Sequence, residues 1–288
     1  MRPSSARKIG VIGLGLLGSA IAKRLLAAGF PVCGFDIDAG CRARLDAAGG
    51  MVVGSASEVA AACRSIVLSL PDSRVVAAVL GEVEARLSDT TLFIDTTTGD
   101  PDDTVRCSKR LAECGHDFLD ASVGGSSKLL ECGEAILMVG GDADAFQRSS
   151  SVLRAIGGRV FHVGPAGAGI RMKLVFNLVL GLNRAVLAEG LAFASRYGLS
   201  GLQALEILEA GPSYSRAMDT KGRKMIARDF APEARLSQHL KDVGLILAAG
   251  EGCGAQLPLS ILHRQLLEQA ESLGFGAADN SAIIESFR

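Results

Sequence analysis

The sequence contains no tryptophan, only two tyrosines and no long block of charge of one sign. Its 288 residues carry a formal net charge of −1. Because a protein that binds nucleic acid usually presents a basic patch, this balance argues against nucleic acid as a partner. The four histidines lie far apart without the spacing of a zinc motif, so a metal site has little support.

The seven cysteines form no CxxC pair and follow no regular spacing. A scattered, odd set is typical of small apolar residues in a reducing compartment, not of a disulfide framework. No uninterrupted run of about 18 apolar residues is present, so we expect no membrane-spanning helix. The basic N-terminus is followed by a stretch that glycines interrupt, which argues against a signal peptide. We therefore expect a soluble, cytoplasmic protein.

Hydrophobic residues make up 48% of the chain and charged residues 21%. This composition is typical of a globular protein with a substantial core and argues against disorder. A chain of this length forms either one large domain or two ordinary ones.

A glycine-rich motif lies between two expected strands near the N-terminus. Residues 8–13 (KIGVIG) form a short apolar run typical of a buried strand, and a helical pattern follows the motif. A second strand, PVCGFD, ends 18 residues after the last glycine of the motif. The order strand, G-x-G-x-x-G, helix, strand and acid predicts a dinucleotide site. Its cofactor-binding candidates are Gly13, Leu14, Gly15, Leu16, Leu17, Gly18 and Asp36.

Each part of this motif has a physical reason. The glycines permit a tight turn, and the bare backbone lets a pyrophosphate rest against the helix N-terminus. Asp36 would accept hydrogen bonds from the ribose hydroxyls and repel a 2′-phosphate, and no arginine follows it directly. The sequence therefore favours NAD over NADP. The alternative is an ordinary turn that merely needs small residues.

Further strand-like runs alternate with helical patterns up to residue 163. The expected strands cover 65–70, 91–96, 118–123, 135–139 and 159–163. Strands separated by helices predict an α/β fold with a Rossmann-type, doubly wound, mainly parallel sheet. Ligands of such sheets lie beyond the carboxyl ends of the strands, so we expect three loops to surround the cofactor. They are Leu70-Pro71, Thr97-Thr98 and 122–126, although each alone could be ordinary turn chemistry.

A long stretch without proline follows a Gly/Pro/Ala loop that ends near Gly169. A helix from Ile170 to Arg196 would span about 40 Å. Its first turns are apolar nearly all round, which predicts a helix that is buried on most sides. Lys173 and Asn177 interrupt this apolar stretch and, being four residues apart, share one helix face.

Lys173 has two interpretations. A buried lysine is costly unless something neutralises or uses its charge. In one interpretation its stem packs against apolar neighbours while the ammonium reaches water. In the other it is desolvated so that it exchanges protons near neutral pH, positioned by Asn177.

The strand pattern stops after residue 163, and the rest of the chain is predicted to be helical. The expected helices cover 201–210, 214–228, 236–251, 259–273 and 281–287, with glycine and proline between them. We predict a dinucleotide-binding domain over 1–163 and an all-helical domain over 164–288, joined by the long helix. Lys241 and Asp242 fall at the head of one expected helix, where a solvated helix start is the simplest interpretation.

These segments, in this order, resemble the β-hydroxyacid dehydrogenase family over nearly the whole chain. The resemblance rests on GLGLLG (13–18), SLPDS (69–73), IDTTTGDP (94–101), DASVGGSSKLLECGEAILMVGG (120–141), GAGIRMKLVFN (167–177), KDVGLI (241–246) and DNSAII (279–284). The first is similar to the cofactor fingerprint of the family. The next two resemble its nicotinamide-dinucleotide loops, and the fourth resembles its substrate loop.

The resemblance implies a role for individual residues. Lys173 would be the catalytic acid/base and Asn177 its partner. Beyond the glycine motif, the implied cofactor-binding residues are Leu70, Pro71, Thr98 and Lys241. The implied reaction is reversible hydride transfer between NAD and a small 3-hydroxy acid or its oxidised form, with Lys173 taking the hydroxyl proton. The family also implies a homodimer or homotetramer.

The substrate loop departs from the family pattern D-A-P-V-S-G-G. This chain has Ser122 in place of proline, Gly124 in place of serine and Ser126 in place of the last glycine. Gly124 and Gly125 can still offer backbone N–H groups to a carboxylate. The substrate-binding candidates are Ser122, Gly124, Gly125 and Ser126. The identity of the hydroxy acid stays open.

Two other functions fit parts of the sequence. An imine reductase on the same scaffold would reduce a C=N bond, but that resemblance usually comes with another residue in place of Lys173. A non-catalytic NAD-binding or interaction protein is supported only by the altered 122–126 loop, and the Lys173/Asn177 pair opposes it.

Overall fold

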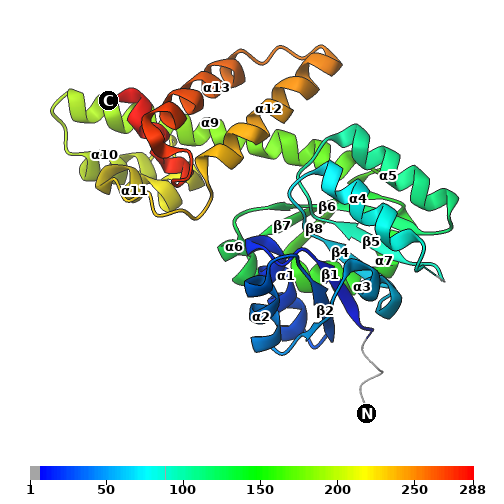
Figure 1. Ribbon diagram of the computed structural model, residues 1–288. Coiled ribbons are helices and arrows are strands. Elements are labelled where there is room, and N and C mark those ends of the chain that lie inside the picture. Colours follow the sequence, from blue (N-terminus) through cyan, green and yellow to red (C-terminus); the bar gives the residue numbers. More distant parts are fainter. Residues whose placement is uncertain (1–6, 88) are drawn as a thin grey trace. The chain divides into compact units, whose positions relative to one another are not determined.

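The structure is a computed structural model that describes residues 7–87 and 89–288 (Figure 1). The chain divides into two compact units, of which unit 1 ends at Lys173 and unit 2 begins at Leu174. The division falls within one continuous helix, α9 (Ala168–Arg196). The first turn of α9 therefore belongs to unit 1, and the rest of the helix belongs to unit 2.

Unit 1 is built on an eight-stranded sheet in the order β3-β2-β1-β4-β5-β6-β7-β8. Neighbouring strands run parallel except β6 and β7, which are antiparallel. The strands are β1 (Ile9–Ile12), β2 (Val32–Phe35), β3 (Met51–Val52), β4 (Ser65–Leu68), β5 (Leu92–Asp95), β6 (Asp117–Gly124), β7 (Ile136–Gly141) and β8 (Arg159–Gly164). The predicted doubly wound, mainly parallel sheet is confirmed. Strand β3 was not predicted, because two residues are too few to show a period.

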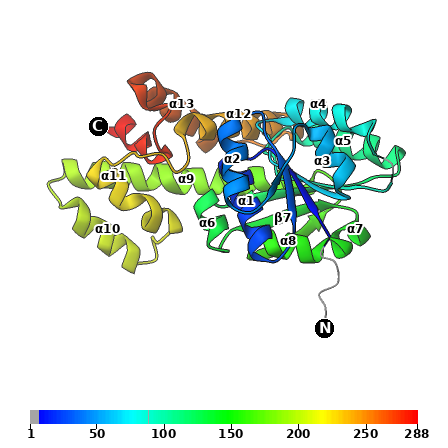
Figure 2. The ribbon, with the colours of Figure 1, turned by 60° about the horizontal axis from the view of Figure 1, so that its bottom comes forward.

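Helices cover both faces of this sheet (Figures 1 and 2). Side chains alternate along a strand, so Ile9 and Val11 join the core under α1, α2, α6 and α8, whereas Ile12 joins the core under α3, α4 and α5. The helices are α1 (Leu16–Ala27), α2 (Ala39–Ala47), α3 (Ala56–Ala62), α4 (Ser73–Glu84), α5 (Pro101–Glu113), α6 (Ser127–Glu131), α7 (Ala143–Arg148) and α8 (Ser150–Ile156).

Aspartate side chains cap the helices that follow β4 and β5. Asp72 accepts hydrogen bonds from the backbone N–H groups of Arg74 and Val75 at the start of α4. Asp100 does the same for the first N–H groups of α5, where Pro101 occupies the first position. These caps satisfy N–H groups that have no partner within the helix. They therefore fix where the loops after β4 and β5 end.

The helix α9 is more exposed than its composition indicated. The prediction of a helix buried on most sides is wrong, because Val175, Val179 and Phe193 are 53%, 52% and 66% exposed. By length and composition alone α9 could cross a membrane, but 44% of its most apolar window is buried inside the protein. The core helix of a soluble protein passes the same test.

Unit 2 is helical, as predicted. Its elements after α9 are α10 (Gly201–Ala210), η1 (Met218–Gly222), α11 (Arg223–Ala227), α12 (Leu236–Cys253), α13 (Pro258–Ala270), η2 (Glu271–Phe275) and η3 (Asn280–Phe287). The sequence predicted ordinary helices throughout, but η1 and η2 are π-helical and η3 is a 3₁₀ helix. Apolar spacing over so few residues cannot distinguish these windings from an α-helix.

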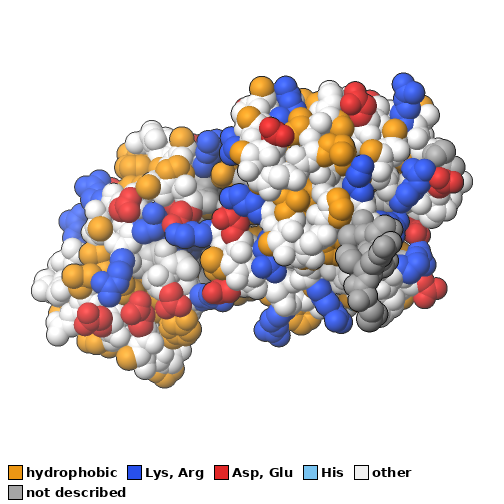
Figure 3. Space-filling model, turned by 90° about the horizontal axis from the view of Figure 1, so that it is seen from below, with side chains coloured by type: hydrophobic (Ala, Val, Ile, Leu, Met, Phe, Trp, Pro, Cys, Tyr) orange, Lys and Arg blue, Asp and Glu red, His pale blue; other side chains and the backbone are white. Residues whose placement is uncertain are grey.

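The surface mixes charges of both signs. On the face that Figure 3 shows, basic and acidic side chains are interspersed, with apolar patches between them. Exposed ion pairs include Lys23–Glu131 at 2.9 Å and Arg148–Asp117 at 2.6 Å. Pairs of this kind contribute about 0–1 kcal/mol each. They set the charge pattern of the surface and add little to the stability of the fold.

A buried ion pair joins two segments of unit 2. The carboxylate of Asp279, which is 0% exposed, accepts from Lys221 Nζ at 2.9 Å through both oxygens. It also accepts from Ser281 Oγ at 2.7 Å and from the backbone N–H groups of Glu233 and Ala234. Burial opposes ionisation of this group, but the hydrogen bonds and the charge of Lys221 prevail and lower the pKa of Asp279 to about 2.

We predict that Asp279→Ala lowers the free energy of unfolding by about 3–5 kcal/mol, because the buried Lys221 then keeps only its longer contact with Glu233, at 3.5 Å. The pKa of Asp279 is lower in the folded than in the unfolded state. Its stabilisation is therefore present above about pH 4 and is lost as the pH falls towards about 2. Urea unfolding near neutral pH and in acid measures both effects.

The double variant Lys221→Met/Asp279→Leu serves as the control, because it removes both charges and fills the space with apolar atoms. It should recover part of the lost stability. Equal stabilities of the wild type and Asp279→Ala would contradict a stabilising role of this pair.

Candidate active site

The glycine motif forms the turn between β1 and α1. Gly13 has a φ of +91°, and a Cβ there would lie 2.2 Å from the carbonyl oxygen of Ser69. A Cβ on Gly18 would lie 1.9 Å from the carbonyl oxygen of Gly13. A Cβ on Gly15 would meet no such atom within 4 Å. Packing therefore requires the outer glycines, whereas Gly15 leaves bare backbone at the N-terminus of α1, which fits a pyrophosphate.

The leucines of the motif take different places. Leu14 is fully buried beneath the turn, and Leu17 packs against the core under α1. Leu16, the first residue of α1, is 75% exposed. Two of the three leucines thus hold the turn on the sheet, and only Leu16 presents its side chain to the outside.

Asp36 follows β2 and faces the glycine motif. Its carboxylate accepts hydrogen bonds from the backbone N–H groups of Leu14 at 2.6 Å and Asp38 at 2.8 Å. Arg42, in the first turn of α2, donates to the carbonyl oxygens of Asp36 and Ile37 at 2.6 and 3.1 Å. Asp36, which the sequence predicts to bind the ribose hydroxyls, is thus held against the glycine turn. The Arg42 guanidinium binds backbone carbonyl oxygens beside it.

The loops after β4 and β5 are joined to each other. The backbone N–H of Leu70 donates to Thr97 Oγ1 at 3.1 Å. The backbone of Ser69 bonds to the end of β1 at 2.9 Å, which attaches the first of these loops to the glycine turn. The structure thus brings together the loops that carry Pro71 and Thr98, as expected for the carboxyl edge of a parallel sheet.

The four predicted substrate residues take different positions near the end of β6. Ser122 lies within the strand and is 1% exposed, and its Oγ has no hydrogen-bond partner among the described residues. Gly124 ends the strand, and Gly125 turns the chain with a φ of +137°. Ser126 Oγ accepts from the backbone N–H of Leu129 at 3.2 Å and caps α6. The Ser126 hydroxyl is therefore used by the fold itself.

Asp120, within β6, holds the start of α9. One carboxylate oxygen accepts from the backbone N–H of Gly167 and the other from that of Ile170, each at 2.8 Å. Such N–H groups have no partner within the helix, and a negative charge is favoured at this end of it. Burial raises the pKa of Asp120, while the backbone hydrogen bonds oppose that rise. The sequence analysis did not single out Asp120, because its partners lie 47 and 50 residues away.

The first turns of α9 also bring Lys173 to the end of β6. Its Nζ donates to the carbonyl oxygen of Val123 at 2.6 Å, and the residue is 9% exposed. The ammonium therefore binds the backbone of the strand instead of extending into bulk water. Asp120 and Val123 are three residues apart on one strand, so a single strand orients both the helix and the amine.

Within unit 2, Asn177 and Asp242 form a buried polar pair. Asn177 Nδ2 donates to Asp242 Oδ2 at 3.0 Å, and the two residues are 5% and 8% exposed. For Asp242 the interpretation as a solvated helix start is wrong, because α12 begins at Leu236 and places Asp242 inside the helix. Lys241 beside it is half-buried. Burial lowers the pKa of Arg184, farther along α9, to about 10, although nearby carboxylates, including Asp242, oppose this shift.

Two protein families match the chain. Residues 8–164 match the NAD binding domain of 6-phosphogluconate dehydrogenase, and residues 167–287 match the domain described as NAD-binding of NADP-dependent 3-hydroxyisobutyrate dehydrogenase. The chain is 36% identical over 282 residues to 2-(hydroxymethyl)glutarate dehydrogenase of Eubacterium barkeri, covering 96% of this chain and 94% of that protein.

Solved structures show the same likeness. The structure of 3-hydroxyisobutyrate dehydrogenase of Mycobacterium tuberculosis with L-serine has a TM-score of 0.90 at 29% identity, covering 98% of this chain and 99% of that one. An imine reductase from Pseudomonas sp. has a TM-score of 0.68 at 22% identity, covering 98% of this chain and 100% of that one. The second likeness shows a shared fold and nothing more.

We predict that Gly169→Ala lowers the free energy of unfolding by about 1–3 kcal/mol. A Cβ on Gly169 would lie 2.5 Å from the carbonyl oxygens of Asp120 and Met138, so α9 would be pushed away from β6. Gly190→Ala is the matched control in the same helix, because a Cβ there meets nothing within 4 Å. It should be neutral or stabilising by up to about 1 kcal/mol. Thermal unfolding of both variants measures the difference, and equal effects would contradict the close contact.

Proposed function

Because the chain belongs to the β-hydroxyacid dehydrogenase family, we propose that it catalyses reversible hydride transfer between NAD and a small 3-hydroxy acid. The observation that carries this proposal is Lys173, which is 9% exposed and has its amine 2.6 Å from the Val123 carbonyl oxygen. This amine belongs to the unit that also carries the glycine turn. The nicotinamide cofactor supplies the hydride acceptor for oxidation and the hydride donor for reduction.

Lys173 acts in this proposal as the general acid/base. During oxidation its neutral amine accepts the proton of the substrate hydroxyl, and during reduction its ammonium returns that proton to the carbonyl oxygen. The Val123 carbonyl directs the amine without adding a charge beside it. An ammonium has three N–H donors, so the bond to Val123 uses only part of its capacity.

Asn177 orients Lys173 or the substrate hydroxyl in this proposal. Its amide is held by Asp242, which accepts its Nδ2–H at 3.0 Å inside unit 2. A fixed amide loses less conformational freedom when it positions a second group. Lys241 is proposed to approach the nicotinamide end of the cofactor, and its support is the resemblance of KDVGLI (241–246) to the family motif.

The substrate is proposed to bind through its carboxylate at the Gly124–Gly125 turn. Backbone N–H groups in a turn can bind an anion without a charged side chain, and the Ser126 hydroxyl, which accepts from Leu129 N–H, still has its own proton to donate. The names of two similar proteins fit the same substrate class. Both 2-(hydroxymethyl)glutarate and L-serine carry a hydroxyl on a carbon next to the α-carbon of a carboxylate.

NAD is proposed in preference to NADP. The carboxylate of Asp36 is held beside the glycine turn by Leu14 and would repel a 2′-phosphate there. Basic side chains also lie near this turn. The Arg42 guanidinium binds the carbonyl oxygens of Asp36 and Ile37, and Lys23 and Arg44 line a cavity with Leu14 and Gly15. The negative charge of Asp36, where the ribose is expected to bind, therefore supports NAD, which lacks the 2′-phosphate.

We predict that Lys173→Met lowers kcat by at least about 10²–10⁴-fold, because the variant keeps an apolar stem but has no amine to exchange the proton. The affinity for NAD should stay nearly unchanged. NADH absorbance measures turnover with 3-hydroxyisobutyrate, glycerate, threonate, 3-hydroxypropionate and 2-(hydroxymethyl)glutarate. Lys109→Met, at an exposed position on α5, is the matched control and should keep full activity. Full turnover by Lys173→Met would overturn the assignment.

We predict that Asp36→Ala weakens NAD binding about tenfold or more, because hydrogen bonds from the ribose hydroxyls to a charged acceptor are lost. The preference for NAD over NADP should shrink, since the repulsion of the 2′-phosphate is also lost. Calorimetric titration with both cofactors measures the ratio. Asp46→Ala, an exposed acid on α2, is the matched control. An unchanged NAD/NADP ratio in Asp36→Ala would count against this role.

A further inference from the structure

A second buried carboxylate lies beneath the loops that are proposed to hold the cofactor. Asp95 is the last residue of β5 and is 5% exposed. It stands next to Asp120 across the β5–β6 register, so the two acids lie side by side at the carboxyl edge of the sheet. Asp120 binds the start of α9. No step of the proposed reaction uses Asp95.

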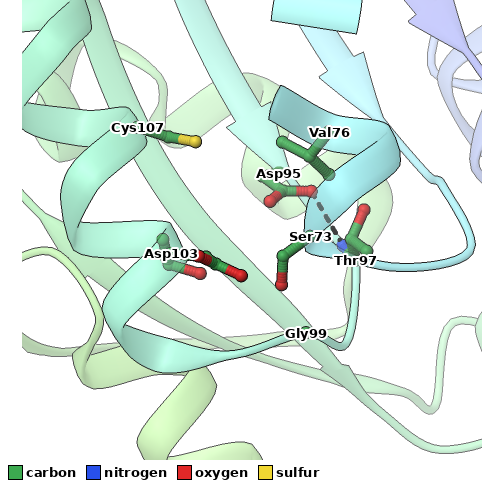
Figure 4. A pocket seen from close by; sticks show the side chains of 8 residues that line it. Ser73, Val76, Asp95, Thr97, Gly99, Asp103 and Cys107 are labelled. Atoms are coloured by element: carbon green, nitrogen blue, oxygen red, sulfur yellow. Dashed lines mark hydrogen bonds between the residues drawn. The ribbon is translucent and has the colours of Figure 1, made fainter. Parts of the chain in front are cut away.

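Asp95 borders a small cavity that is enclosed by α4, α5 and the loop after β5 (Figure 4). The cavity measures about 10 Å³ and is lined by Ser73, Val76, Asp95, Thr97, Gly99, Asp103, Thr104 and Cys107. A space of this size has room for about one water molecule. This space is too small for a substrate or a cofactor.

Hydrogen bonds connect Asp95 to both cofactor loops. The carboxylate accepts from the backbone N–H of Thr97 at 2.9 Å. Thr97 Oγ1 in turn accepts from the backbone N–H of Leu70 at 3.1 Å. Asp95 therefore holds the backbone of Thr97, and the side chain of the same threonine holds Leu70.

The surroundings of Asp95 disfavour its charge. Burial raises its pKa to about 7, the hydrogen bonds from Thr97 oppose that rise, and the Asp120 carboxylate adds to it. From α5 the acidic groups that face the cavity are Asp103, which pairs with Arg106, and the thiol of Cys107. From α4 the facing residues are Ser73 and Val76 and from β4 Leu68, none of which titrates.

We propose that Asp95 is a positioning residue whose protonation loosens the two cofactor loops, so that affinity for the cofactor falls as the medium becomes acidic. The ionised carboxylate accepts the Thr97 backbone N–H and so fixes the residue whose hydroxyl receives Leu70 N–H. After protonation one carboxyl oxygen becomes a donor, and the remaining bonds lose their charge assistance. This proposal rests on the proposed NAD-dependent function.

The test measures two quantities between about pH 5.5 and 8.5, a range that brackets the titration of Asp95. Calorimetry gives the dissociation constant of NAD, and NMR of the ligand-free protein follows the amide signals of Leu70 and Thr97. For the wild type we expect NAD to bind roughly fivefold more tightly at the alkaline end. Both amide signals should titrate with the same midpoint as the binding.

Asp95→Asn should bind NAD weakly at every pH, and its Leu70 and Thr97 amide signals should not titrate. Asp103→Asn is the matched control, because it removes a carboxylate from the same cavity without touching the Thr97 bonds. It should keep the wild-type pH profile. If Asp95→Asn does not fold, Thr97→Val takes its place, since it removes the hydroxyl that accepts from Leu70 N–H and keeps the bond from Thr97 N–H to Asp95. Its Thr97 amide signal should still titrate, whereas its Leu70 amide signal should not.

Amide signals that stay constant with pH in the wild type would overturn the proposal, as would a dissociation constant that stays constant while the signals titrate. A pH profile that Asp95→Asn retains would overturn it as well. If the wild type binds no NAD at any pH, the proposed function fails instead. The NMR titration of the ligand-free protein then still decides whether the protonation of Asp95 changes the loops that carry Leu70 and Thr97.

Discussion

Asp120 extends from β6 to the backbone N–H groups of Gly167 and Ile170, which lie 47 and 50 residues farther along the chain. The contact is close because Gly140 and Gly169 have no side chains. A Cβ on Gly140 would lie 2.6 Å from Asp120 Oδ1, and one on Gly169 would lie 2.5 Å from the Asp120 carbonyl oxygen. A carboxylate at a helix N-terminus is electrostatically favoured. The direction of α9, and with it the position of Lys173, depends on this contact.

The carboxyl edge of the sheet thus carries two buried acids with separate tasks. Asp120 binds the helix that presents the amine, and Asp95 binds the loop that follows β5. Burying a carboxylate is costly unless hydrogen bonds compensate it, and here backbone N–H groups provide most of them. Such bonds are directional, so they specify the shape of the loops more sharply than apolar packing would. The edge of a parallel sheet is also where ligands of this fold bind.

The helix α9 carries buried polar residues and exposed apolar ones beside its core residues. Its polar residues Lys173, Asn177 and Arg184 are buried, whereas Val175 and Val179 are more than half exposed. The buried polar groups that have a described contact are held by Val123 and Asp242. An unpaired polar or charged group inside a protein is costly. These partners therefore allow Lys173 and Asn177 to be buried. The same helix also contributes Leu187, Ala188 and Leu191 to the core of unit 2.

Much of the fold follows from local patterns. The order of strands and helices, the glycine turn and the position of Lys173 in a helix each depend on residues within one or two elements, so spacing alone indicated them. The burial of α9 and the winding of η1, η2 and η3 did not follow, because they depend on what packs around each helix. The same holds for Asp242, whose burial depends on the contact with Asn177 from another helix.

What the sequence by itself determined is the sheet, the dinucleotide turn and the candidate amine, since these are written in short, periodic or glycine-rich segments. What only the tertiary structure decided is which groups hold them. The contacts from Asp120 to Ile170, from Val123 to Lys173 and from Asn177 to Asp242 join residues 50 to 65 positions apart. A pattern within one segment carries no information about a partner in another. Strand pairing and helix packing must first bring the two together.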